Sequence, residues 1–484
     1  MVMRKDQQGQ LGKSSLMKQQ KLLTGLVLGA GLTCSSLVFA AAGSVGADGE
    51  RTSRISDASV SVLDLDSMPS RPKPILELGG DFLGPGNIRR GYELPTGAVW
   101  QPTLLVFGTY RTALQSFHAN NETQSEFANR LDLFANLQLT PSERFVLSLR
   151  PLDDEGRFTS YQFEPDHGLP DDTGWNDEVN SRVNTFFFEG DFGEIFPNLS
   201  KDDRRATDYG FVVGRQPVNY QAGLLINDNI DAIGITRNTL LPKGGSDLQV
   251  TFMYGWNEIH RGDNTERENQ NLYGFFVSAD TPKATRNYDF LYVQDRNGDT
   301  DGFFWGISDI RRVGHYNLSS RIVGSQALDK ESAAVQDGTL IFAELSWTPA
   351  WTDNNVYINA FAGIDNFRSA ARDPSTGGPL GRTGILFSAI GMGRYGAPLG
   401  NGADSSVGGA VGYQWFIDPI VNQFIFEVGT RKGTKSGDDT SIAGGVRYRH
   451  VIGQHIVAQV DVFGALNESR SDAYGGRFEL RVEF

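Results

Sequence analysis

Segments in which apolar and polar residues alternate dominate the chain. In the last such segment, apolar or small side chains occupy every second position, at Tyr474, Gly476, Phe478, Leu480, Val482 and Phe484. Charged side chains fill the positions between them, at Arg477, Glu479, Arg481 and Glu483. Because successive residues of a β-strand point to opposite faces, this pattern predicts a strand with one apolar and one charged face.

The same alternation recurs upstream, over residues 131–139, 248–256 and 456–462. These runs extend over about ten residues, the length that a tilted strand needs to cross a bilayer. Trp and Tyr residues near the ends of the runs fit the aromatic girdles of membrane barrels. We therefore predict an all-β fold, a transmembrane antiparallel β-barrel in the outer membrane of a Gram-negative cell.

The alternation and the turn residues predict about 18 strands, with 16 possible if two weaker segments are not strands. An even number places both ends of the barrel on the periplasmic side. The strands are expected near residues 102–117, 126–139, 144–152, 182–192, 208–216, 230–241, 248–258, 271–280, 286–294, 302–312, 314–326, 338–348, 355–366, 405–417, 420–431, 441–451, 454–465 and 474–484.

The connections between these strands fall into two classes by length. Short turns, several of which contain Thr-Pro or Asp-Pro, are expected on the periplasmic side, with 193–207 as a longer exception. Longer loops are expected outside the cell, at residues 153–181, 217–229, 259–270, 327–337 and 367–404. This sorting agrees with the short periplasmic turns and long outer loops of bacterial barrels.

The N-terminal region precedes the barrel, which we place at residues 102–484. Residues 22–47 carry no charge and follow Lys18 and Lys21, so residues 1–47 are interpreted as a signal peptide with a start-site extension. An uncleaved anchor and a lipoprotein held through Cys34 remain alternatives. Residues 48–101 contain several prolines and no sustained period, which predicts a periplasmic or plug-like extension.

Composition narrows the function classes. The chain has 57 Gly, 31 Phe and 15 Tyr among 484 residues, and its net charge is -14. A strongly acidic chain is not expected to bind nucleic acid, because phosphate binding needs a basic surface. The six His residues show no metal-ligand spacing, and no nucleophile elbow or phosphate-binding glycine loop occurs. We therefore expect neither an enzyme nor a cofactor.

Strand parity identifies side chains that would line the lumen. Arginine presents a planar fork to carboxylate, phosphate or sulfate, and charged walls select solutes in a pore. The alternative is that these charges pair across strands and brace the wall. The pore-lining candidates are Arg111, Arg130, Asp132, Arg150, Arg321, Glu344, Glu427, Arg447, Arg449, Asp461, Arg477, Glu479, Arg481 and Glu483.

The segment 295–302 places oxygen ligands at alternate positions, as a calcium loop does. The candidate ligands are Asp295, Asn297, Asp299 and Asp301. The terminal Glu of such a loop is missing, because Ser308 stands eleven residues after Asn297. A tight, solvated outer turn is the favoured interpretation, with calcium as the weaker one.

Two resemblances refine the prediction. The final strand, which ends on Phe484, resembles the terminal strand of outer-membrane barrels, which implies recognition by the barrel-assembly machinery. Residues 182–235, with Gly214-Arg215-Gln216-Pro217 and Tyr220, resemble porin-like barrels, including carbohydrate porins and the alginate-export family. In such barrels a loop after this strand can narrow the pore, which makes Arg215, Tyr220, Asp228 and Asp231 constriction candidates. Loop 367–404 is a second candidate.

Together these features predict a porin that lets small hydrophilic solutes diffuse across the outer membrane, with a weak preference for anionic solutes and with lipid and lipopolysaccharide around it. A dedicated exporter of an anionic polysaccharide and a receptor or adhesin with a closed lumen remain alternatives. Solute identity, oligomeric state and the role of residues 48–101 are left open by the sequence.

Overall fold

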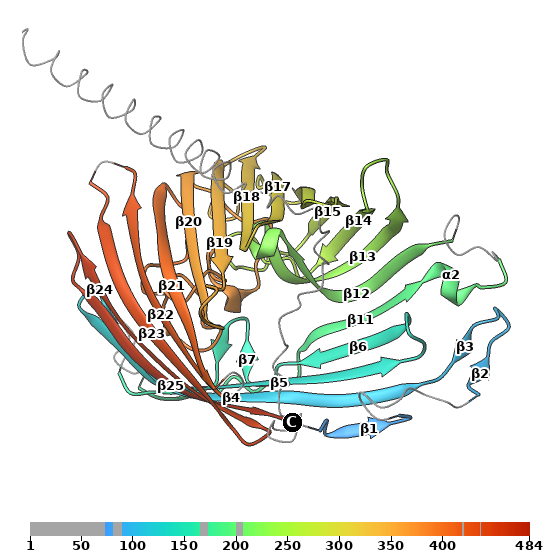
Figure 1. Cartoon of the computed structure of the whole chain (residues 1–484), viewed down its shortest axis with the longest axis horizontal. Helices are drawn as coiled ribbons and strands as arrows, with labels where there is room; N and C mark the ends of the chain where they lie inside the picture. The colour runs from blue at the N-terminus through green and yellow to red at the C-terminus, as the bar shows by residue number, and fades with distance from the viewer. Residues whose placement is uncertain (1–72, 81–89, 165–172, 200–206, 419–420, 436) are drawn as a thin grey trace, which may run out of the picture. The chain divides into compact units, whose positions relative to one another are not determined.

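Eighteen antiparallel strands close into a single ring in the computed structural model of the chain (Figure 1). The structure describes residues 73–80, 90–164, 173–199, 207–418, 421–435 and 437–484. The strands follow one another around the ring in chain order, each hydrogen-bonded to the next, and the last pairs with the first. The predicted all-β barrel and its count of eighteen strands are confirmed.

Most strands of the ring are ten to seventeen residues long, so that each can cross a bilayer at a tilt. The ring consists of β4 (Thr103–Ala119), β5 (Glu122–Gln138), β6 (Arg144–Leu149), β11 (Val183–Asp191), β12 (Tyr209–Tyr220), β13 (Ile226–Leu240), β14 (Asp247–Asn257), β15 (Gln270–Asp280), β16 (Thr285–Asp295), β17 (Gly302–Val313), β18 (Tyr316–Ala327), β19 (Gly338–Trp347), β20 (Asn355–Asp365), β21 (Ser406–Asp418), β22 (Asn422–Gly433), β23 (Thr440–Ile452), β24 (Ile456–Asn467) and β25 (Ala473–Glu483).

The ring closes between β25 and β4. The register pairs Arg481 with Arg111 and Glu483 with Thr109. Beyond the strand, Gly108 and Phe484 exchange backbone hydrogen bonds of 2.7 and 3.0 Å. Closure leaves no free sheet edge in the ring, and a spanning sheet requires this because lipid offers no hydrogen-bond partners to the backbone.

Short elements flank the ring. β1 (Leu76–Leu78) pairs with residues 104–106 of β4, and it belongs to the region 48–101 that the sequence assigns to an N-terminal extension. Residues 1–72 lie outside the described residues, and the predicted signal peptide with them. The other short elements are β2 (Tyr92–Glu93), β3 (Val99–Trp100), β7 (Asp153–Asp154), β8 (Arg157–Phe158), β9 (Ser160–Gln162), β10 (Gly174–Asn176), α2 (Phe192–Ile195), η1 (Gln221–Gly223) and η2 (Pro374–Thr376).

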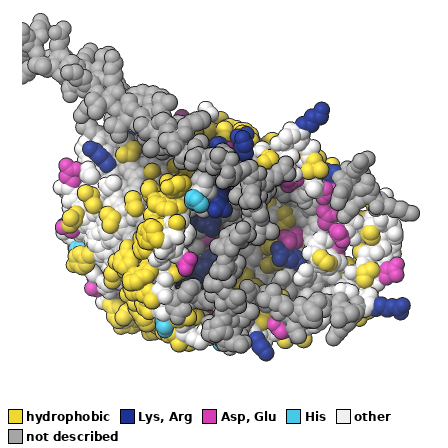
Figure 2. All heavy atoms as spheres, viewed as in Figure 1, with side chains coloured by type: hydrophobic (Ala, Val, Ile, Leu, Met, Phe, Trp, Pro, Cys, Tyr) yellow, Lys and Arg dark blue, Asp and Glu magenta, His cyan; other side chains and the backbone are white. Residues whose placement is uncertain are grey.

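The two faces of the wall differ as the alternation predicts. On β14, Phe252 is 61% exposed, whereas its neighbour Met253 is buried. Figure 2 shows apolar side chains spread over the strands at the left of the view. A barrel whose outward side chains are apolar presents the surface that a bilayer requires. No helix among the described residues is long and apolar enough to span a membrane.

One predicted loop is much shorter than expected. Residues 217–229 were predicted to form an outer loop, but β12 continues to Tyr220 and β13 begins at Ile226. Only Gln221–Leu225 connect the two strands. The polar residues Asn219, Asn227 and Asn229 hide the strand pattern, because this part of the hairpin does not face lipid.

Candidate functional site

A long loop between β20 and β21 fills part of the barrel interior. We call residues 366–405 the inner loop. Its backbone accepts hydrogen bonds from Arg111 on β4 and Arg130 on β5, and it donates others to Glu427 on β22. The inner loop also pairs with β13, where Asn227 donates its backbone N–H to the Ala371 carbonyl and accepts the backbone N–H of Asp373, each at 2.9 Å. A segment that contacts such separate parts of a closed ring must pass through its interior.

Individual side chains anchor the inner loop to the wall. The Glu427 carboxylate accepts hydrogen bonds of 3.0 Å from the backbone N–H groups of Ile385 and Leu386. The Arg130 guanidinium donates to the Gly391 carbonyl at 2.6 Å, and that of Arg111 donates to the Ile390 carbonyl at 3.3 Å. The predicted pore-lining residues Glu427, Arg130 and Arg111 thus hold the loop that lies in the lumen.

The hairpin tip, residues 221–225 with the adjoining ends of β12 and β13, also turns inward. The Gln221 side chain donates to Asp289 on β16 at 2.7 Å, although two strands, β14 and β15, separate β13 from β16 in the ring. Tyr220 stacks on Phe276 of β15, with ring centroids 3.5 Å apart and planes 6° apart. Leu224, at 3% exposure, is buried in the apolar cluster beneath the tip.

Arg372 joins the hairpin tip to the inner loop. Its guanidinium is fully buried and donates to the carbonyl of Gly223 at 2.6 Å and to that of Gly377 at 2.6 Å. Burial lowers the pKa of Arg372 to about 10, which leaves the group charged at neutral pH. Since both acceptors are backbone carbonyls, this cation fixes the conformation of both segments at once.

A cavity of about 370 Å³, which we call the passage, lies between these segments and the wall. It is lined by β5, by the end of β6, by the hairpin and by the inner loop. Three guanidinium groups line it, those of Arg130, Arg150 and Arg382. Arg382 is exposed and makes no hydrogen bond or ion pair with the residues that the structure describes.

Arg150 lies just beyond β6, among acidic side chains. It bonds Asp132 and Asp153 at 3.0 Å and lies 3.7 Å from Asp373 of the inner loop. Burial alone lowers the pKa of Arg150, but the charges of Asp373, Asp132 and Asp153 outweigh burial and raise it. For Asp373, burial raises the pKa, but Arg150 and the hydrogen bonds from Ser375 outweigh burial and lower it. Both groups therefore stay ionised.

Most of the predicted lumenal charges form ion pairs with one another. Arg449 is the exception among the eight arginines and bonds the amide oxygen of Gln459 at 2.8 Å. The pairs are Arg111 with Glu479, Arg130 and Arg150 with Asp132, Arg321 with Glu344, Arg447 and Arg477 with Asp461, Arg477 with Glu479, and Arg481 with Glu483. Most of these charges are thus ion-paired, mainly between neighbouring strands. Arg382, which has no such partner among the described residues, was not among the predicted candidates.

The four constriction candidates lie in the inward hairpin. Arg215 and Asp231 are register partners and form a two-point ion pair of 2.9 and 3.0 Å. Tyr220 forms the stack described above. Asp228 is buried and accepts two hydrogen bonds from His260, one from its backbone N–H at 2.9 Å and one at its ring Nδ1 at 3.0 Å. Whether the hairpin restricts solute passage stays a prediction.

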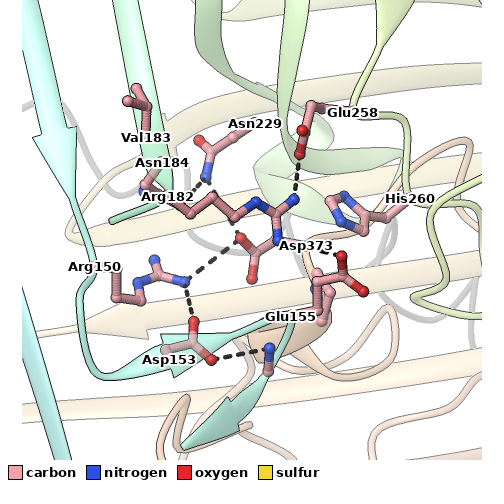
Figure 3. Close-up of a pocket in the computed structure, with 12 residues that line it drawn as sticks. Arg150, Asp153, Glu155, Arg182, Val183, Asn184, Asn229, Glu258, His260 and Asp373 are labelled. Atoms are coloured by element: carbon pink, nitrogen blue, oxygen red, sulfur yellow. Dashed lines mark hydrogen bonds and ion pairs between the residues drawn. The ribbon is translucent and has the colours of Figure 1, made fainter. Parts of the chain in front are cut away.

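Beside the passage lies a second, small cavity of about 30 Å³. Figure 3 shows Arg150 between Asp153 and Asp373, and Arg182 in an ion pair with Glu258. His260 lies on the far side of Arg182 in this view. Burial alone lowers the pKa of His260, but the hydrogen bond and charge of Asp228 outweigh burial and raise it. Sequence analysis did not identify Glu258 or Arg182, because neither belongs to a recurring motif.

The calcium candidates lie in the turn between β16 and β17. Asp295 accepts hydrogen bonds from the Thr300 hydroxyl at 2.6 Å and from the backbone N–H of Asn297 at 3.2 Å. Asp301 accepts one from the backbone N–H of Asp295 at 2.7 Å. These carboxylates stabilise a turn between strands, and Asp299 and Asn297 add no further contact that points to a cation.

Known proteins resemble the chain in structure only. No protein-family model matches the sequence, and no curated protein matches it. The Pseudomonas aeruginosa outer membrane protein opdK is 10% identical, with a TM-score of 0.50 over 78% of this chain and 98% of that one. A BenF-like porin from Pseudomonas fluorescens Pf-5 is also 10% identical, with a TM-score of 0.52 over 78% and 98%. Pseudomonas aeruginosa OccK2 (OpdF), solved in complex with glucuronate, is 11% identical, with a TM-score of 0.50 over 79% and 98%.

The TM-scores of 0.50 to 0.52 establish a shared fold. The matches extend over nearly the whole length of the solved barrels, and the closed ring and apolar exterior of this chain agree with them. The chain therefore has the fold of the outer-membrane porins to which it is similar.

Proposed function

We propose that the chain is an outer-membrane channel through which small hydrophilic solutes diffuse, with a preference for small carboxylates. The observation that carries the proposal is the passage between the inner loop, the hairpin and β5, with Arg382 exposed in it and not ion-paired to any described residue. Rings of eighteen strands are wide enough to leave an aqueous lumen. The proposal involves passage without covalent chemistry.

Charge placement supports the preference for anions. Arg130 and Arg150 share their charges with Asp132, Asp153 and Asp373, so their net field in the passage is small. Arg382 has no such partner among the described residues, and its guanidinium can form two parallel hydrogen bonds with a carboxylate. Field lines concentrate in a narrow water-filled passage with low-dielectric walls, so that a single uncompensated charge influences selectivity.

Sugar acids are the first solutes to test. One barrel of similar fold was solved in complex with glucuronate, which is a small carboxylate. Purified protein in planar bilayers is expected to give single-channel currents. Under a KCl gradient, the zero-current potential is expected to show a higher permeability for chloride than for potassium. In a liposome-swelling assay, glucuronate is expected to enter liposomes that contain this protein. Its rate of entry is expected to exceed the rate in control liposomes that contain a neutral or cation-selective porin.

The alternatives make different predictions in the same experiments. A barrel that inserts but conducts no current and admits no sugar would be a closed receptor, and the channel proposal would fail. Block of the current by an anionic polysaccharide, with no effect of monomeric glucuronate, would favour an exporter. Conduction with a preference for potassium would retain the channel but overturn the preference for carboxylates.

A further inference from the structure

The connection between β14 and β15 brings together three potential metal ligands. It forms a small hairpin of its own, in which His260 and Glu266 pair as antiparallel neighbours and Arg261 bonds Thr265 through backbone groups at 2.9 Å. Glu258 follows the end of β14 and has a positive φ of 55°, and the chain then turns into the short bridge at His260. The ligand atoms of Glu258, His260 and Glu266 all lie within 4.8 Å of one another.

His260 is the central group of this cluster. His260 is only 4% exposed, and its Nδ1 lies 3.0 Å from the Asp228 carboxylate. Its Nε2 is buried and has no hydrogen-bond partner among the residues that the structure describes. A buried polar atom without a partner is unfavourable, so a ligand that binds Nε2 would remove that cost.

The hydrogen bond at Nδ1 prepares the ring for metal binding. When Nδ1 donates its proton to a carboxylate, the lone pair of the neutral imidazole lies on Nε2. Histidines that bind metals commonly donate their other ring N–H to a carboxylate in this way, and the carboxylate fixes the tautomer and the orientation of the ring. Asp228 is placed for that role, because it also accepts the backbone N–H of His260.

We propose that Glu258, His260 and Glu266 form a binding site for a divalent transition metal ion of the zinc class. Zinc is bound in proteins by His nitrogen and by Asp or Glu oxygen, and open sites combine three protein ligands with water in the fourth position. Calcium and magnesium prefer sites in which every ligand atom is oxygen, so a site that contains a histidine nitrogen favours a zinc-class ion over these two ions.

The charges around the cluster allow a cation to bind. Arg182 and Arg215 both pair with Glu258, and each has a second acidic partner, Glu155 for Arg182 and Asp231 for Arg215. With Asp228 and Glu266 included, carboxylates outnumber guanidinium groups in this region. A carboxylate has four lone pairs on its two oxygens, so Glu258 can bind a metal ion while it accepts hydrogen bonds from arginine.

The position of the site gives it a consequence for the channel. Glu258 and His260 line the cavity that adjoins the passage, and Asn229 and Asp373 belong to the walls of both. A bound divalent ion would add positive charge beside the passage. We expect it to increase the preference for anions, and this second effect rests on the proposed function, whereas metal binding itself does not.

The test measures binding directly. Untagged full-length protein in detergent, stripped with a chelator, is titrated with zinc chloride by calorimetry, and its visible absorption is recorded with Co²⁺. One ion per barrel is expected, with a Co²⁺ spectrum that zinc abolishes. Glu266→Gln and His260→Ala are expected to lose at least about tenfold in affinity, and Asp228→Asn about 10–100-fold, because the last removes the acceptor that orients the ring.

Control variants separate this site from weak surface binding. His315→Ala changes an exposed histidine in the turn between β17 and β18 and is expected to bind zinc like the parent protein. Heat-modifiable migration in electrophoresis verifies that each variant is folded. The proposal fails if the parent barrel binds no stoichiometric zinc, if Glu266→Gln binds it as tightly as the parent, or if calcium competes at equal concentration. If zinc binds but the barrel conducts no current, the result would instead count against the proposed function.

Discussion

The carboxylate of Glu427 on β22 lies 3.0 Å from the backbone nitrogen of Leu386 in the inner loop and accepts its hydrogen bond. A second bond of 3.0 Å comes from the adjacent nitrogen of Ile385, and the Tyr357 hydroxyl donates a third. One wall residue thus binds two successive backbone groups of the segment that occupies the lumen. Hydrogen bonds to a charged group contribute about 1.5–3 kcal/mol each, so this contact is a main attachment of the loop.

Glu427→Gln is expected to loosen the inner loop. The amide keeps one acceptor oxygen but loses the charge and the second acceptor, so the attachment weakens by about 1.5–3 kcal/mol. Single-channel recordings are expected to show a larger mean conductance with more current noise. Glu331→Gln, in the exposed loop between β18 and β19, is the matched control and should leave the recordings unchanged. Identical traces from the two variants would contradict the anchoring role.

Arg382→Ala is expected to reduce the preference for anions. A unit charge about 17 Å from a permeating ion contributes about 1 kcal/mol at an effective dielectric constant near 20, with opposite sign for chloride and potassium. Its removal is therefore expected to lower the ratio of chloride to potassium permeability by up to about thirtyfold. The zero-current potential under a KCl gradient measures that ratio. Arg382→Lys should retain most of it, and Arg312→Ala, an exposed arginine on β17, should retain all of it. An unchanged potential in Arg382→Ala would remove Arg382 from the mechanism.

Glu479→Ala is expected to destabilise the closure of the barrel. Arg111 and Glu479 lie on the two strands that meet there, and their side chains are 20% and 6% exposed at a distance of 2.6 Å. The loss of one partner leaves a buried charge unpaired and costs about 3–5 kcal/mol. On the same strand, the pair of Arg481 and Glu483 is 40% and 41% exposed, so Glu483→Ala should cost at most about 1 kcal/mol. Urea unfolding in detergent compares the two; equal midpoints would refute the difference.

Tyr220→Ala is expected to free the hairpin tip without unfolding the barrel. Aromatic stacking on Phe276 contributes about 0.5–1.5 kcal/mol beyond the area it buries. The backbone amides of residues 221–225 should therefore exchange hydrogen up to about tenfold faster, which mass spectrometry of the corresponding peptide measures. Tyr316→Ala serves as the control, because Tyr316 contacts Trp347 far along the chain from the tip. Unaltered exchange at the tip would mean that the stack does not hold it.

The barrel itself could be predicted because its information is local. Alternation specifies a strand and its two faces within about ten residues, as in β25, and the register of each hairpin follows from its turn. The same parity placed Arg111, Arg447 and Glu479 on the lumenal face. It could not say which charge meets which, because partners such as Arg111 and Glu479 are 368 residues apart in sequence.

The sequence named loop 367–404 as a constriction candidate, but the contacts inside the barrel could not be predicted, for a related reason. Residues 366–405 form no period that reveals their contacts, since the loop lies against side chains from several strands at once. Arg382 therefore gave no signal. The cluster of Glu258, His260 and Glu266 was missed because its ligands come from two paired segments, whereas the sequence search considered spacing along a single one. A search for cross-strand His and Glu pairs within short connections would have found it.

Arg372 makes the inner loop and the hairpin tip a single mechanical body. Each is bonded to the same buried guanidinium, so either one can leave its place only by stranding a cation in the protein interior, at a cost of several kcal/mol. Motions of the two segments are therefore concerted. If the barrel conducts as proposed, we expect its conductance to change between discrete levels, because graded widening would require the two segments to move separately.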